Sequence, residues 1–342
     1  MKKKIALALV LLMVSGCSQK KETQELVVSS WGLSEEVLRN EVFKPFEEMH
    51  NVKIVLDSGS TSERFAKFSS GDNSNIDVIE LSQKAADDGY QADLFEKIDL
   101  NKLENGSALI DAAQEVTRRG YGVPYTINSI GIVYNTETVK EPIASWKDLW
   151  REDLVGKVAI PEIASTFGPA MIQMANDYSG GDLSSDNGER AFEGLEALKP
   201  NIKKTYKKSS DLSVMMSTGE IDVAVVGDFG FDVIKKSVPT AELVFPESGT
   251  YANFNTIEIN KNSKNKELAY KFVDWRLSQV LQEKTAATLN EAPVNKNVVL
   301  NDEVALNKTY GPIAENAKTL NYEVMNPLMP EWIDRYNRLM NQ

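Results

Sequence analysis

The chain has 342 residues, a net charge of -12 at neutral pH, 42% hydrophobic residues and a single cysteine. Nucleic acid and anionic lipid surfaces are excluded as expected partners, because both need a basic protein surface. One cysteine cannot form a disulfide within the chain, so a hydrophobic core must stabilise the fold. A chain of this length is expected to form two domains.

The N-terminus has the pattern of an export signal. Three lysines at positions 2–4 precede an apolar run over residues 5–14, which is too short to span a bilayer of ~30 Å. Small residues then lead to Cys17, as in a bacterial lipobox. We expect residues 1–16 to be a signal peptide, Cys17 to be lipidated, and residues 17–25 to tether an extracytoplasmic protein to the cell membrane. An ordinary signal peptide with an incidental cysteine is the alternative.

The first half of the body alternates short apolar strands with helical patterns. Strands are predicted at 26–31, 52–60 and 76–82, and helices at 34–49 and 62–70. This order predicts a parallel sheet with helices on both faces. Ligands of such sheets bind at the carboxyl ends of the strands, where loops open onto a crevice.

The second half repeats this alternation, which predicts a second α/β lobe. Strands are predicted at 155–162, 221–228, 241–247 and 255–261, and helices at 167–178, 189–198, 209–217, 266–284, 312–318 and 330–340. Between the halves, residues 122–135 combine a proline and glycines with β-branched residues. This composition suits a hinge in which few residues absorb the change in backbone angles. A plain strand–loop–strand is the alternative.

Motifs of catalysis and metal binding are missing from the sequence. His50 is the only histidine, and no cysteine lies beside it, so neither a zinc site nor a Cys/His nucleophile is supported. The chain has no G-x-S-x-G, Walker A or G-x-G-x-x-G motif. We therefore expect no enzymatic activity, no cofactor and no bound metal.

Several segments carry a resemblance to a known family, among them SSWG (29–32), YGVPYTINSIGIVYNTETV (121–139), SWKDLW (145–150), STGEIDVAVVGD (217–228) and NKNSKNKELAYKFVDW (260–275). In order and spacing they resemble the extracellular solute-binding proteins of bacterial ABC importers, most closely the spermidine/putrescine-binding branch. The resemblance implies a monomer of two α/β lobes that close on a solute and deliver it to separate permease and ATPase subunits.

The implied lobes are residues 26–128 with 256–305, and residues 129–255 with 306–342, with the ligand cleft between them. Trp31 ends the first strand, where an aromatic ring can stack on a ligand or attract a cation by roughly 0.5–2 kcal/mol. The resemblance also places a ligand-stacking tryptophan here. Packing of Trp31 against the following helix is the alternative.

Small polar residues follow the next two strands. Ser58 and Ser60 lie after the second strand, where the N–H groups of a helix start favour anions. A cap of the following helix is the alternative for this loop. Ser82 and Gln83 follow the third strand and match a family position that lines the pocket. Glu80, beside them, could instead be solvated.

Further candidates lie along the crossover and in the second lobe. Tyr125 and Asn128 are expected where the crossover passes the cleft floor, and Ser165 and Thr166 at a helix start that favours an anionic group. Asp228 could pair with an ammonium, with Phe229 as an apolar wall, or could cap the following helix. The remaining candidates are Tyr251, Asn253 and Asn255.

Two departures from the polyamine-binding pattern affect the expected ligand. No acidic residue lies between Glu162 and Asp177, and Gly227 stands where that branch has a stacking aromatic residue, which Tyr251 could replace. We expect a receptor for a small polar, amine-containing, polyamine-like solute. The alternatives are a zwitterionic or anionic solute, such as an amino acid-like compound or a phosphonate, or a structural or adhesive lipoprotein without a transport ligand.

Overall fold

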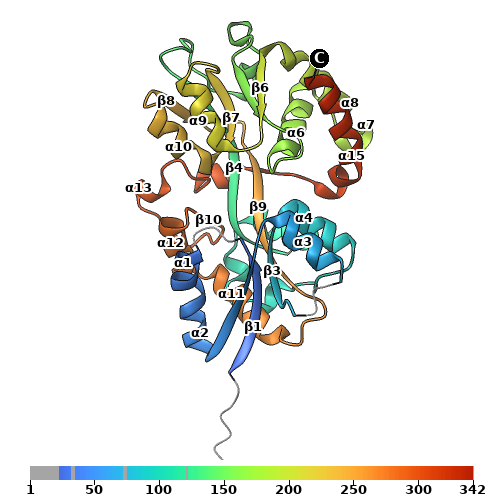
Figure 1. The fold of residues 1–342 in the computed structure, drawn as a ribbon, viewed down its shortest axis with the longest axis vertical. Helices are drawn as coiled ribbons and strands as arrows, with labels where there is room; N and C mark the ends of the chain where they lie inside the picture. The colour runs from blue at the N-terminus through green and yellow to red at the C-terminus, as the bar shows by residue number, and fades with distance from the viewer. Residues whose placement is uncertain (1–22, 32–34, 72–74, 121, 342) are drawn as a thin grey trace, which may run out of the picture.

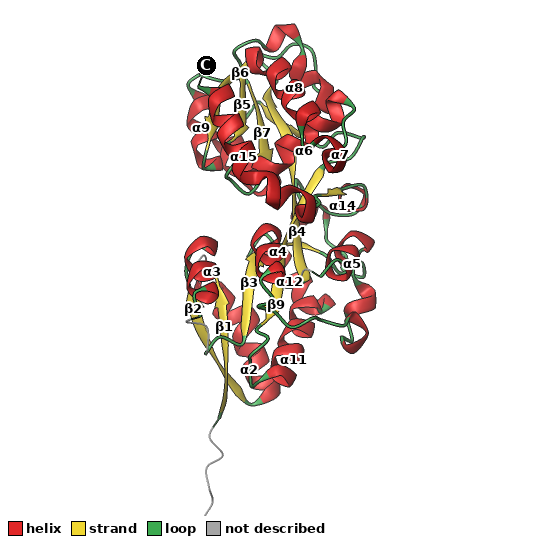
Figure 2. Cartoon of the chain, turned by 90° about the vertical axis from the view of Figure 1, so that its right-hand side faces the viewer, coloured by secondary structure: helices red, strands yellow, loops and turns green. Residues whose placement is uncertain are grey.

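The computed structural model describes residues 23–31, 35–71, 75–120 and 122–341. The predicted signal peptide, Cys17 and most of the predicted tether lie outside these residues. The body is elongated and has two lobes, with strands β4 (Val123–Asn135) and β9 (Tyr251–Ile259) running from one lobe into the other (Figure 1). Helices flank the sheet of each lobe (Figure 2).

The lower lobe in Figure 1 is built on the strand order β2-β1-β3-β9-β4. Strands β1 (Gln24–Ser30), β2 (Val52–Ser58) and β3 (Val78–Ser82) are parallel, so their carboxyl ends meet at one edge. Strand β9 is antiparallel to β3 and β4. The helices of this lobe are α1 (Glu35–Leu38), α2 (Lys44–His50), α3 (Thr61–Ser69), α4 (Gln83–Gln91), α5 (Asp111–Arg118), α11 (Lys266–Leu277) and α12 (Gln279–Thr288).

The upper lobe continues the sheet in the order β4-β7-β5-β6. Strand β5 (Val158–Pro161) is parallel to β6 (Ile202–Tyr206) and β7 (Val223–Gly227), whereas β4 is antiparallel to β7 and β8 (Ala241–Val244). The helices here are α6 (Gly168–Ser179), α7 (Leu183–Asp186), α8 (Glu189–Leu198), α9 (Ser209–Ser217), α10 (Phe231–Ser237) and α15 (Tyr322–Met340).

Strand β4 changes its partner at the junction of the lobes. It pairs with β9 up to Ser129 and with β7 from Ile130 onward. The predicted crossover is therefore one long strand, with a register shift between Pro124 and Thr126. Its role as a hinge stays a prediction.

The predicted α/β class is confirmed, with three differences in detail. The sheet of each lobe, which we expect to be mostly parallel, is mixed, because β4 and β9 run against their neighbours. The helix predicted at 266–284 is two helices, because Ser278 has extended backbone angles and caps α12 by accepting from the N–H of Leu281. Helix α15 begins eight residues before the predicted start and includes Pro327 and Pro330. Within the described residues, no helix is long and apolar enough to cross a membrane.

Candidate ligand cavity

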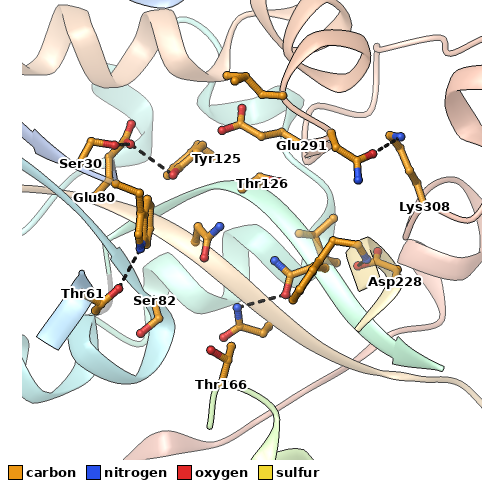
Figure 3. Close-up of a pocket in the computed structure, with 18 of the residues that line it drawn as sticks. Ser30, Thr61, Glu80, Ser82, Tyr125, Thr126, Thr166, Asp228, Glu291 and Lys308 are labelled. Carbon is orange, nitrogen blue, oxygen red and sulfur yellow. Dashed lines mark hydrogen bonds between the residues drawn. The ribbon is translucent and has the colours of Figure 1, made fainter. Parts of the chain in front are cut away.

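A cavity of about 490 Å³ lies where strand ends from both lobes converge. Figure 3 shows Ser30, Glu80 and Tyr125 at one end of it and Asp228 and Lys308 at the other. The lining residues come from the ends of β1, β3 and β7, from the middle of β4 and β9, from α1, the start of α3 and the loop before α6, and from two segments near the C-terminus. They are Ser30, Trp31, Leu38, Thr61, Glu80, Ser82, Tyr125, Thr126, Ile127, Asn128, Thr166, Asp228, Phe229, Asn253, Asn255, Leu289, Asn290, Glu291, Asn307 and Lys308.

Eight of the thirteen predicted ligand-binding residues line this cavity. They are Trp31, Ser82, Tyr125, Asn128, Thr166, Asp228, Asn253 and Asn255. The pairing of β4 with β9 brings Asn128 opposite Asn253, and Nδ2 of Asn253 donates to Oδ1 of Asn128 over 3.2 Å. Contact of these residues with a ligand stays a prediction.

The other five predicted residues lie outside the cavity lining. Most of them form hydrogen bonds elsewhere in the protein. Ser60 caps α3, where its side chain and that of Glu63 form a reciprocal capping box. The Oγ of Ser165 donates to the carbonyl of Glu162 over 2.6 Å, and α6 begins only at Gly168. Gln83 is fully buried and donates to the carbonyl of Leu320. Ser58 ends β2, which is the outermost strand of the lower lobe.

Tyr251 does not replace the aromatic residue missing at position 227. Its ring packs on Trp146 with centroids 5.5 Å apart, and its hydroxyl donates to Oδ2 of Asp177 over 2.8 Å. A Cβ at Gly227 would lie 2.5 Å from the ring of Phe167, which leaves no room there for a side chain. Phe229 lines the cavity instead and remains 48% exposed.

Trp31 is half-buried at the end of β1 and held in place by two contacts. Its Nε1 donates to Oγ1 of Thr61 over 2.9 Å, and the guanidinium of Arg64 lies 5.0 Å from the ring centroid. Arg64 is buried and donates from Nη1 to the carbonyls of Ser29 and Glu80. Burial lowers the pKa of Arg64, although the negative charge of Glu80 opposes that shift.

A buried ion-pair cluster forms the floor at the Glu80 end. Nε of Arg276 lies 2.9 Å from Oε1 of Glu80, and its Nη2 lies 3.0 Å from Oε1 of Glu291. Oε2 of Glu80 accepts from Ser30 over 2.5 Å and from Tyr125 over 3.3 Å. Glu80 is thus buried, and the alternative of a solvated carboxylate is wrong.

The pKa values of this cluster follow from its burial and charges. Burial alone would lower the pKa of Arg276, but Glu291 and Glu80 outweigh it and raise that pKa, so Arg276 remains a cation. Burial, followed by the negative charge of Glu80, raises the pKa of Tyr125 well above its ordinary value. Tyr125 therefore acts as a neutral hydrogen-bond donor.

Asp228 closes the opposite end and is saturated with hydrogen bonds. Its Oδ2 accepts from the N–H of Thr309 over 2.9 Å and from its Oγ1 over 2.5 Å. Its Oδ1 accepts from the N–H of Phe229 over 2.8 Å. Burial raises the pKa of Asp228 to about 6, even though these bonds favour the ionised form. Asp228 holds the segment around Thr309 against the end of β7 rather than capping a long helix.

The segment from Leu289 to Lys308 supplies lining residues that the sequence did not indicate. Asn290 and Asn307 have positive φ angles of 56° and 61°, which turn the chain toward the cavity. Lys308 donates from Nζ to Oδ1 of Asn290. Asparagine tolerates this backbone region better than most residues. No spacing pattern in the sequence predicts that these positions lie close to β1 or β3.

Comparison with known proteins places this geometry in a family. The model of the bacterial extracellular solute-binding protein family matches residues 41–312. A solved structure of an ABC transporter protein from Clostridium perfringens is 51% identical, with a TM-score of 0.89 over 92% of this chain and 99% of that one. The spermidine/putrescine-binding periplasmic protein of Escherichia coli is 24% identical over 285 residues, 81% of each chain. The spermidine/putrescine substrate-binding protein of Streptococcus pneumoniae is 18% identical, with a TM-score of 0.73 over 92% of this chain and 99% of that one, and shares the fold.

Proposed function

The chain belongs to the bacterial extracellular solute-binding protein family, and we propose that it is the receptor of an ABC importer for a small polar solute that carries an amine. The observation that carries this proposal is the cavity itself, because both lobes contribute side chains to it. A solute that touches both lobes stabilises the closed arrangement over an open one, by a population shift. The receptor then presents the closed form to the permease and ATPase subunits.

The lobes proposed for this motion are residues 26–128 with 256–305, and residues 129–255 with 306–342. Support comes from β4, which changes partner between Ser129 and Ile130. Rotation about this junction would move Trp31 and Ser82 relative to Thr166 and Asp228 without breaking either lobe's own sheet.

We also propose that the protein acts outside the cytoplasm, attached by a lipid on Cys17, as a monomer without enzymatic activity. The support is the Lys-rich, apolar and small-residue pattern before Cys17. Cys17→Ser in a bacterial host should release the protein from the membrane fraction into the medium or periplasm. Equal membrane retention of the variant would contradict lipidation.

Ligand screening tests the receptor function. Thermal unfolding is measured with polyamines, amino acids, phosphonates and thiamine-like compounds, and one class should stabilise the protein. Ligand at about 100 times its dissociation constant adds about 2.7 kcal/mol to the free energy of unfolding. Small-angle scattering should show a more compact molecule with that ligand. Absence of stabilisation by any class would favour a structural or adhesive lipoprotein.

A further inference from the structure

The carboxylates that line the cavity are all engaged by the protein itself. Glu80 and Glu291 share the guanidinium of Arg276 at 2.9 and 3.0 Å. Both oxygens of Asp228 accept hydrogen bonds, from Thr309 and Phe229. No lining carboxylate of the described residues is therefore left over to pair with a ligand ammonium.

The aromatic rings are engaged in the same way. The guanidinium of Arg64 lies 5.0 Å from the ring centroid of Trp31, and that of Arg276 lies 4.0 Å from the centroid of Tyr125. A cation over an aromatic ring uses the same electrostatic attraction that would draw a ligand ammonium. A further stacking residue at position 227 is blocked by Phe167. Each of these two rings thus already has a protein guanidinium beside it, which opposes the approach of a ligand ammonium.

Each carboxylate that lines the cavity already has a basic group or several hydrogen-bond donors beside it. Glu80, Glu291 and Asp228 contribute three carboxyl groups, and Arg64, Arg276 and Lys308 contribute three basic groups. Burying two further ammonium groups would remove their hydration without an unpaired carboxylate in return, which is strongly unfavourable. A zwitterion lowers this cost, because it brings one ammonium group instead of two and an anionic group that a basic side chain can pair with.

Lys308 is the group best placed to receive an anion. It is the one basic residue among the described lining residues, and it forms no ion pair with any residue that the structure describes. Its Nζ donates to the amide oxygen of Asn290, which leaves further donors on the ammonium. Figure 3 shows Lys308 at the end of the cavity opposite Glu80.

We propose that the amine-bearing solute is a zwitterion, with one ammonium and one anionic group, and that Lys308 binds the anionic group. Oxygens of Ser82, Thr166 and Asn255 receive the ammonium, since these side chains line the cavity and have no hydrogen-bond partner among the described residues. This inference rests on the proposed receptor function and narrows its ligand class.

A matched pair of ligands tests the inference on the purified full chain. 1,4-Diaminobutane and 4-aminobutanoate have the same four-carbon chain length and differ in one end group, and calorimetric titration compares them alongside α-amino acids and aminoalkylphosphonates. At least one zwitterion should bind tenfold or more tightly than 1,4-diaminobutane. Equal or tighter binding of the diamine overturns the inference but leaves the receptor function standing. Absence of binding by every compound, including spermidine, overturns both.

Substitutions at Lys308 test the assigned anion site. Lys308→Gln should weaken zwitterion binding about tenfold or more, because a charged hydrogen bond is lost, and should not weaken diamine binding. Lys308→Arg keeps the charge and should retain most of the affinity. Lys203→Gln on β6 makes the same change of charge away from the cavity and should bind like the parent chain. Unchanged zwitterion affinity in Lys308→Gln would contradict the assignment.

Discussion

Glu258 is a buried carboxyl in β9 that offers a quantitative test of the structure. It is 2% exposed, and its Oε1 has no hydrogen-bond partner among the described residues. Burial raises the pKa of Glu258 to about 8, although hydrogen bonds with Thr256 and with the N–H of Gly122 oppose the shift. The carboxyl is therefore mainly protonated in the folded protein at pH 7.

The raised pKa makes Glu258 destabilising at neutral and alkaline pH. The unfolded chain releases this proton near the ordinary pKa of 4.5, whereas the folded protein retains it up to about pH 8. The free energy of unfolding therefore falls between these two values as pH rises, by about 1.4 kcal/mol for each pH unit. The cost is roughly 3 kcal/mol at pH 7 and levels off above pH 8.

Glu258→Gln removes this titration while keeping the shape of the side chain. The variant should match the parent chain near pH 4.5 and exceed its free energy of unfolding by roughly 3 kcal/mol at pH 7. Urea denaturation followed by tryptophan fluorescence at pH 5 to 9 measures the difference, with Glu196→Gln on the exposed face of α8 as the matched control. A difference that stays constant with pH, or that shrinks as pH rises, would refute the reasoning.

Three further variants probe the cavity. Arg276→Met leaves the buried Glu80 and the half-buried Glu291 without their shared cation, and should lower the free energy of unfolding by about 3–5 kcal/mol in urea titrations; a neutral result would contradict a charged cluster. Trp31→Ala should weaken binding of the identified ligand about fivefold to thirtyfold in calorimetry, through loss of an apolar contact surface worth about 1–2 kcal/mol. Unchanged affinity would mean that Trp31 only packs against Thr61 and Arg64. Gly227→Phe should lower the thermal unfolding midpoint, since overpacking against Phe167 costs about 1–3 kcal/mol, and an unaltered midpoint would argue against this packing.

The sequence predicted those parts of the site that follow from strand order. Trp31 and Ser82 end parallel strands, and the carboxyl ends of such strands meet at one edge. Asn128 lies on the predicted crossover, but the strand predicted at 255–261 starts after Asn253, so the pairing of β4 with β9 that brings the two residues together is not visible in the sequence. The capping box of Ser60 and Glu63 is also visible in the sequence as an S-x-x-E pattern, which indicates a helix cap for Ser60 and not a ligand contact.

The site residues that the sequence did not predict are brought to the cavity by contacts between distant parts of the chain. Arg276 lies in α11 among buried apolar residues and meets Glu80, 196 positions away, inside the core. Lys308 reaches the cavity through a connection held by the bonds of Thr309 to Asp228. Neither periodicity nor spacing encodes such long-range contacts. The basic groups that contact or line the cavity, Arg276 and Lys308, are therefore indicated by no pattern in the sequence.

The change of partner along β4 has a mechanical consequence. A strand hydrogen-bonded to β9 on one stretch and to β7 on the next belongs to the sheets of both lobes. With β4 as the predicted hinge, rotation of one lobe against the other would be absorbed by twisting of β4 and of β9, the other strand that runs between the lobes. Asn128 lies just before the change of partner, at Ser129, so such a rotation would displace it less than the lining residues that are farther from this junction.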